Sequence, residues 1–259
     1  RVAAVIDVQI VALSGWPVMG PSAADQRLLL NETIAAGADL VGGCPHLEGG
    51  DTLGPTEFFL QTATDHGVDV DLHTDETLDP TARGLAELAE LVSSGFEHQV
   101  TASHCVSLSM QPEFEQRATA EAVAAAGIGV VALPHTNLFL QGRGHSPMPR
   151  GLTAVAALRA ADARVAAGAD NLQDPFNPVG RACPFETAGL MIMTAHMLPH
   201  EAWASVSGVS AAVTGFGAQT IEAGQPADLV AARAATVREA IAFGPTDRIV
   251  WRNGQRLAA

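Results

Sequence analysis

The feature that most constrains the fold is a strict alternation of short apolar runs and helical patterns over the first 170 residues. The apolar runs predict strands at 2–12, 39–43, 67–73, 99–103, 128–133 and 164–169. Helical spacing of apolar residues, bounded by Pro and Gly, predicts helices at 21–37, 55–66, 79–95, 112–126 and 153–161. Because a helix between two strands brings them together in parallel, the pattern predicts an α/β protein with a parallel sheet.

Polar side chains gather where the predicted strands end. These ends carry Gln9, His46, His73 with Glu76, His104, His135 and Asp170. A random scatter of nine histidines would seldom place four at successive strand ends. In a (β/α)8 barrel the chemistry lies at the carboxyl ends of the strands. The pattern therefore favours a metal site, with an imidazole as ligand and a nearby carboxylate as proton carrier, over a solvated polar loop.

The pattern changes after residue 170. Helices are expected at 185–197 and 201–213, and a strand is expected to reach residue 230. A turn at Asn253-Gly254 predicts a terminal hairpin over 248–257. We therefore expect two domains: a partial barrel with late helices at 1–220, and a C-terminal segment of a small β-sandwich at 221–259.

Composition excludes several kinds of function. Hydrophobic residues make up 47% of the 259 residues and the formal net charge is −14, which disfavours nucleic acid and anionic membranes as partners. The chain has neither Lys nor Tyr, which excludes a Schiff-base lysine and a tyrosine acid. Three distant cysteines predict no disulfide framework, and no apolar run is long enough to cross a bilayer. We expect a cytoplasmic protein.

Seven segments together resemble the metal-dependent amidohydrolase superfamily, in the branch that contains cytosine deaminase and N-isopropylammelide hydrolase. They lie at 6–11, 41–46, 71–76, 101–104, 137–143, 168–171 and 224–230, in the family's order. The resemblance implies a (β/α)8 TIM-type barrel of which strands three to eight are present, plus the C-terminal part of a small β-sandwich.

The resemblance also implies roles for four residues near the strand ends. His73 and Asp170 would be metal ligands, and Asp170 would also take the proton of the attacking water. Glu76 would carry a proton to a ring nitrogen of the substrate. His104 would orient the water or polarise the bond under attack. The implied cofactor is one divalent metal ion, Zn or Fe.

Three further residues would contact the substrate. Gln9 is similar to a family glutamine that hydrogen-bonds the amide edge of the ring, and Phe176 stands where an aromatic residue covers the pocket. Asn171 stands where cytosine deaminase has an aspartate and the ammelide hydrolase has an asparagine. The implied substrate is a small neutral nitrogen heterocycle, such as a cytosine-like pyrimidine or an aminotriazine. Whether the protein forms a homo-oligomer is left open.

One departure from the family pattern concerns the metal. The first ligand pair of the superfamily is a His-x-His, and none of the nine histidines of this sequence forms one. We therefore expect the first two barrel strands and the start of the sandwich to lie upstream of Arg1. The main hypothesis is hydrolytic deamination, in which water activated by the metal attacks a ring C–N carbon. The alternative is a catalytically incomplete barrel fragment, or a ligand-binding protein without a full metal site.

Overall fold

A computed structural model describes residues 5–217 and 220–257. Its main feature is a six-stranded sheet in which the strands follow one another in chain order, each pairing in parallel with the next. The strands are β1 (Val11–Leu13), β2 (Leu40–Gly43), β3 (Asp69–Thr74), β4 (Val100–His104), β5 (Gly129–Ala132) and β6 (Val165–Ala167). In the described part of the chain β1 and β6 are edges, so the structure confirms a parallel α/β fold and leaves barrel closure a prediction.

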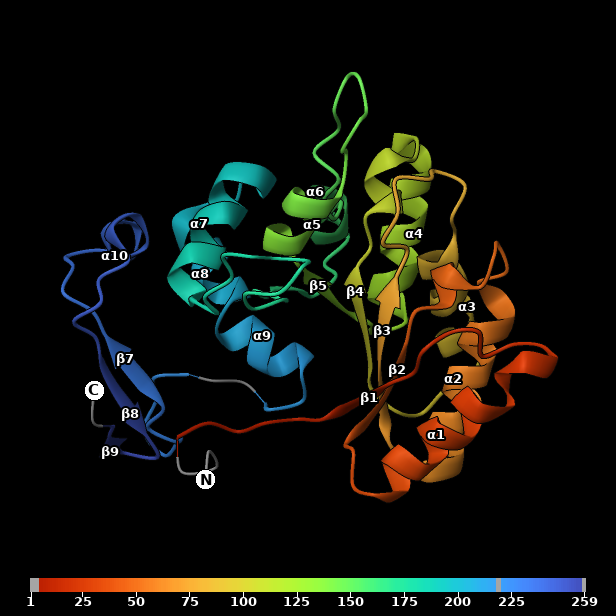
Figure 1. The fold of residues 1–259 in the computed structure, drawn as a ribbon. Helices are drawn as coiled ribbons and strands as arrows, with labels where there is room; N and C mark the ends of the chain where they lie inside the picture. Colours follow the sequence, from red (N-terminus) through yellow and green to blue (C-terminus); the bar gives the residue numbers. More distant parts are fainter. Residues whose placement is uncertain (1–4, 218–219, 258–259) are drawn as a thin grey trace.

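Helices cover one face of this sheet. They are α1 (Ala24–Ala35), α2 (Leu53–His66), α3 (Gly84–Ser93), α4 (Glu113–Ala125) and α6 (Val155–Ala160). Figure 1 shows α1 to α4 gathered beside strands β1 to β4. In β3 the side chains alternate, so that Val70 and Leu72 join the apolar core while Asp71 and His73 point to the other face. The alternation therefore separates the core from the polar face on which the site is built.

The second half of the chain adds helices and a small antiparallel sheet. The helices are α5 (Pro134–Leu140), α7 (Pro184–Ala195), α8 (Pro199–Ser205), α9 (Gly208–Val213) and α10 (Val237–Phe243). The small sheet holds β7 (Leu229–Ala231), β8 (Ile249–Arg252) and β9 (Gln255–Arg256), and lies well apart from the parallel sheet in Figure 1. The predicted terminal hairpin is confirmed by the pairing of β8 with β9. Among the described residues, no helix is both long enough and apolar enough to cross a bilayer.

The first predicted strand is largely wrong. Residues 2–4 of that prediction lie outside the described residues, and regular strand begins only at Val11. Ile6, Val8 and Ile10 are more than half exposed. The segment runs as extended chain past the small sheet (Figure 1). Asp7 in this segment pairs with Arg252 of β8 at 2.5 Å. A β-branched run becomes a strand only where a neighbouring strand supplies hydrogen bonds, and here the ladder with β2 starts at Val11 and Leu40.

Several helix boundaries also differ from the prediction. The helix expected from Asp79 begins at Gly84, because Asp79 instead closes a turn by accepting the backbone N–H and hydroxyl of Thr81. The helix expected at 201–213 is broken into α8 and α9 at Ser207. Helices α5 and α10 were not predicted. Each is only seven residues long, too short for helical spacing to stand out in sequence.

Asp75 connects the end of β3 to the start of α3. Its carboxylate is buried and accepts the backbone N–H groups of Gly84 at 3.1 Å and Leu85 at 2.9 Å. Its own carbonyl accepts the N–H groups of Val106 and Ser107 beyond β4. One residue therefore ties the strand ends to the helix that follows.

Replacing this carboxylate should destabilise the fold. We expect Asp75→Ala to lower the free energy of unfolding by at least the ~0.5–2 kcal/mol that a lost helix cap costs, because two buried N–H groups lose their acceptor. Guanidinium unfolding followed by circular dichroism measures this. The matched control is Asp25→Ala in the exposed first turn of α1, which should change the free energy by less than ~0.5 kcal/mol. Equal stability of the two variants would contradict the role given to Asp75.

Candidate metal and active site

The register between β3 and β4 brings two histidines together. His73 pairs with Ser103, and Thr74 pairs with His104, at the carboxyl end of the sheet. The two imidazole rings lie 4.8 Å apart, centroid to centroid. Since sheet pairing sets this spacing, residues 31 positions apart in sequence meet at one place. The two histidines belong to a single site, as the sequence predicted.

His104 reaches this site through an unusual backbone conformation. Strict alternation would leave its side chain on the same face as Thr74, opposite His73. Its φ of 67° is in the left-handed region and ends the regular strand, as does the φ of 49° at Cys105. A non-glycine residue in this region costs on the order of 1–3 kcal/mol, so the surrounding structure must hold it there. Backbone strain at a strand end thus accompanies the placement of a site residue.

Glu76 lies between the two imidazoles. Its Oε2 is 3.5 Å from His104 Nε2 and 3.9 Å from His73 Nδ1. Burial alone would raise the pKa of this carboxyl, but His73 and His104 outweigh it and the pKa is lowered. Burial alone would likewise lower the pKa of His73, but Glu76, Asp170 and Asp71 together raise it. Glu76 is therefore an ionised carboxylate at neutral pH, facing two nitrogen groups.

Asp170 follows β6, the edge strand two places along the sheet from β4. It has a φ of 59°, and its charge is close enough to raise the pKa of His73. Burial raises the pKa of Asp170 itself. Its buried Oδ2 has no hydrogen-bond partner among the described residues, and the same is true of His104 Nε2. Buried polar atoms are rarely left without partners, so these two atoms point to a missing ligand.

These residues fit a divalent metal ion. One nitrogen or carboxylate oxygen atom each from His73, Glu76 and His104 lie within 4.8 Å of one another, and Asp170 adds a carboxylate oxygen without a partner among the described residues; Glu76 and His104 would lie beside the ion. Nitrogen and carboxylate donors suit Zn or Fe. His73 and Asp170, the two ligands expected from the sequence, would hold the ion.

Gln9 lies at the opposite end of the sheet from this group. It precedes β1 rather than following it, and its amide is near Gly215 and Gln99, which itself precedes β4. The expected position of Gln9 at the carboxyl end of the first strand is therefore wrong. The residues that do follow β1 there are Ser14 and Gly15. The error came from placing the strand several residues too early.

The other two expected substrate contacts lie in the loop after β6, near Asp170 in sequence. Asn171 accepts the Thr136 hydroxyl at 3.1 Å and donates to Asp174 at 2.7 Å, so both ends of its amide are engaged. Phe176 is 53% exposed on a turn whose N–H groups are held by Asp174. Their roles in substrate binding stay predictions.

Two residues of the site were not assigned roles from sequence. His46, after β2, has its Nδ1 3.1 Å from the carbonyl of His73. Asp71 lies two residues before His73 on the same face of β3 and accepts the Ser103 hydroxyl at 3.1 Å. His135, after β5, has its Nε2 3.1 Å from the Thr187 hydroxyl. The position of Asp71 two residues before His73 was a usable signal, because residues i and i+2 share a face.

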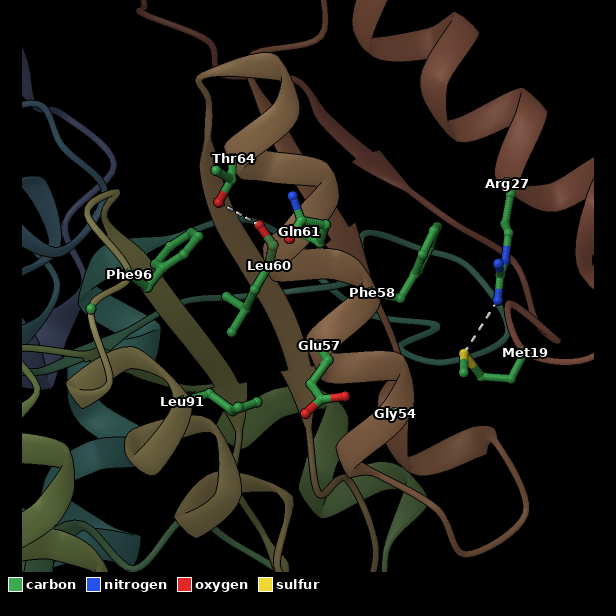
Figure 2. A pocket seen from close by; sticks show the side chains of 11 residues that line it. Met19, Arg27, Gly54, Glu57, Phe58, Leu60, Gln61, Thr64, Leu91 and Phe96 are labelled. Carbon is green, nitrogen blue, oxygen red and sulfur yellow. Dashed lines mark hydrogen bonds between the residues drawn. The ribbon is translucent and has the colours of Figure 1, made fainter.

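A separate hollow lies elsewhere on the molecule. It measures about 630 Å³, flanks α2 on the outer side of the sheet, and is lined by side chains that include Arg27, Phe58 and Phe96 (Figure 2). Arg27 is already engaged there, with its guanidinium 4.7 Å from the Phe58 ring centroid and hydrogen-bonded to the Val18 carbonyl. The hollow has no convergent set of acids and bases, so chemistry favours the strand-end site.

Comparison with known proteins identifies the family. A family model described as "Amidohydrolase family" matches residues 12–258. The chain belongs to the amidohydrolase family. This amidohydrolase is 35% identical over 232 residues to a pterin deaminase of Rhizobium rhizogenes, a match that covers 87% of the chain and 53% of the relative. The chain therefore spans about half the length of the curated relative that it matches.

Two solved structures confirm the branch that the sequence motifs indicated. The 5-methylcytosine deaminase from Klebsiella pneumoniae, liganded with phosphonocytosine, is 30% identical with a TM-score of 0.89. The N-isopropylammelide isopropylaminohydrolase from Burkholderia multivorans is 28% identical with a TM-score of 0.83. Each match covers 99% of this amidohydrolase and 64% of the solved chain. The resemblance to cytosine deaminase and ammelide hydrolase is thus confirmed.

Metal binding by this amidohydrolase should depend on His73 and Asp170. We expect His73→Gln and Asp170→Asn each to weaken zinc binding by more than the roughly 10–100-fold cost of losing an outer-shell partner. Competition with a chromophoric chelator measures the affinity. The control is His66→Gln at the exposed end of α2, which should leave the affinity unchanged. Unchanged affinity in both ligand variants would remove these residues from the metal site.

Proposed function

We propose that this chain belongs to a metal-dependent hydrolase that deaminates a small neutral nitrogen heterocycle. The observation that carries the proposal is the pair of buried atoms without partners, His104 Nε2 and Asp170 Oδ2, beside the Glu76 carboxylate. Such a group can hold a metal, accept a proton and donate one within a single site. The family of the chain supports hydrolysis of a C–N bond.

The substrates named for its relatives share one chemical unit. 5-Methylcytosine, pterin and N-isopropylammelide each carry an amino-substituted ring carbon next to a ring nitrogen, a cyclic amidine. Water adds at that carbon, ammonia or an amine leaves, and a ring carbonyl results. The proposed substrate class is therefore a cyclic amidine, and cytosine, 5-methylcytosine, pterin, isocytosine and aminotriazines are the compounds to test.

The residues divide the proton transfers between them in this proposal. Asp170 accepts a proton from the attacking water, and the raised pKa of its carboxyl supports a role as base. Glu76, which starts ionised, takes up one proton of the attacking water and delivers it to the ring nitrogen, which its place between two imidazoles supports. The proton taken up by Asp170 passes to the leaving amine. His104 orients the attacking water or polarises the bond under attack. A divalent metal held by His73 and Asp170 would supply Lewis acidity that lowers the pKa of water towards ~7.

The absence of a His-x-His from this sequence favours one alternative, a binding protein in place of an enzyme. A protein with an incomplete ligand set would bind a heterocycle without hydrolysing it. Metal analysis and an ammonia assay separate the two. Less than one equivalent of Zn or Fe, together with no ammonia from any candidate ring, would favour the binding protein. The proposed setting is the cytoplasm, whose reducing conditions fit the three free cysteines.

The proton carrier is the sharpest test of the proposed reaction. In this protein, Glu76→Gln should keep its metal and lose roughly 10²–10⁴-fold in turnover, because the amide cannot carry a proton. Ammonia release and metal content measure the two effects. Glu57→Gln, on the outer face of α2 (Figure 2), is the matched control and should keep full turnover. Wild-type turnover by Glu76→Gln would refute the proton-carrier role.

A further inference from the structure

His104 is held from two sides. Its carbonyl accepts the hydroxyl of Thr153 at 2.5 Å, and its ring nitrogen Nδ1 lies 3.0 Å from Nδ2 of Asn137. Only 1% of His104 is exposed, and Asn137 is fully buried. Thr153 therefore holds the strained backbone and Asn137 holds the ring. Asn137 lies in the segment 137–143 that resembles the family, but its residue type alone indicates no role.

The contact with Asn137 determines where the ring carries its hydrogen. An amide nitrogen can only donate, so Nδ1 of His104 must accept with its lone pair. A neutral imidazole with a lone pair on Nδ1 carries its single hydrogen on Nε2. A protonated ring is also disfavoured by this contact, because it would set an N–H group against an N–H group.

The opposite orientation of the Asn137 amide is less favourable. In the observed orientation only its Oδ1 lacks a hydrogen-bond partner among the described residues. Turning the amide over would direct both hydrogens of Nδ2 to that buried position. Buried donors are left without partners more rarely than buried acceptors are. The burial of Asn137 thus favours donation to Nδ1.

We propose that Asn137 selects the His104 tautomer with its hydrogen on Nε2, so that His104 offers the site a hydrogen-bond donor and not a lone pair for the metal. Nε2 has no hydrogen-bond partner among the described residues and lies 3.5 Å from the Glu76 carboxylate. Asn137 is a positioning residue, since it acts through His104. The use of this donor in catalysis rests on the proposed function; the tautomer does not.

Nitrogen NMR tests the tautomer directly. The chain labelled with ¹⁵N-histidine should show a ring with a pyridine-type Nδ1 and a pyrrole-type Nε2, assigned to His104 by its loss in His104→Gln. This measurement needs no substrate and no variant of Asn137. A wild-type spectrum with the hydrogen of His104 on Nδ1 would overturn the proposal, because it would require the opposite amide orientation.

Asn137→Asp reverses the hydrogen-bond requirement. A carboxylate only accepts, so the hydrogen of His104 should move to Nδ1 in this variant. The matched control is Asn31→Asp, which alters a half-buried asparagine whose Oδ1 is 2.7 Å from Nε2 of His66 and should leave the His104 signals unchanged. Unchanged His104 signals in folded Asn137→Asp would show that Asn137 does not select the tautomer.

Turnover links the tautomer to the reaction. If the proposed function holds, Asn137→Asp should lose roughly 10–100-fold in kcat and retain its metal, whereas general loss of structure would lower both. Equal kcat in Asn137→Asp and wild type, with the tautomer reversed, would overturn the use of the Nε2 donor. Failure of the wild-type protein to release ammonia would refute the proposed function and leave the NMR result standing.

Discussion

The site depends on backbone pairing between β3 and β4. Five paired positions, from Val70 with Val100 to Thr74 with His104, fix how far each strand extends at the carboxyl end of the sheet. A shift of one residue would turn His73 toward the helices and bring a core residue to the site face. Because Val70 and Leu72 are fully buried against the helices, such a shift would expose them, and the apolar core holds the register.

Backbone strain is concentrated at the same end of the sheet. Asp75, His104 and Asp170 have φ values of 48°, 67° and 59°, all in the left-handed region. Each ends or follows a strand, and at each the chain leaves the regular alternation of side chains. Hydrogen bonds from buried groups, such as the Thr153 hydroxyl on the His104 carbonyl, offset the cost. Strained strand ends therefore orient the side chains that strand geometry alone would direct elsewhere.

Electrostatics explains why the site tolerates so many buried polar groups. Glu76 favours the protonated form of the neighbouring His73 and His104, and these histidines in turn lower the pKa of Glu76. Asp170 and Asp71, by contrast, have raised pKa values because burial outweighs their partners. The site thus combines a carboxylate that favours ionisation with two that resist it. When neighbouring carboxyl groups differ in pKa in this way, one can act as an acid and another as a base within the same site.

The sequence by itself determined the order of the six parallel strands and most of the helices between them, and it predicted His73, Glu76, His104 and Asp170 as the chemical group. Those features follow from the local periodicity of apolar residues and from the residues at strand ends, both of which can be read in the sequence without knowledge of tertiary contacts. The late start of β1, which moves Gln9 to the far end of the sheet, followed from where β2 supplies a ladder. The role of Asp75 at α3 and the contact of Asn137 with His104 arise from residues at least nine positions apart. Only tertiary packing decides which distant donor meets which buried acceptor, because the spacing of two residues in the sequence does not determine whether they come into contact.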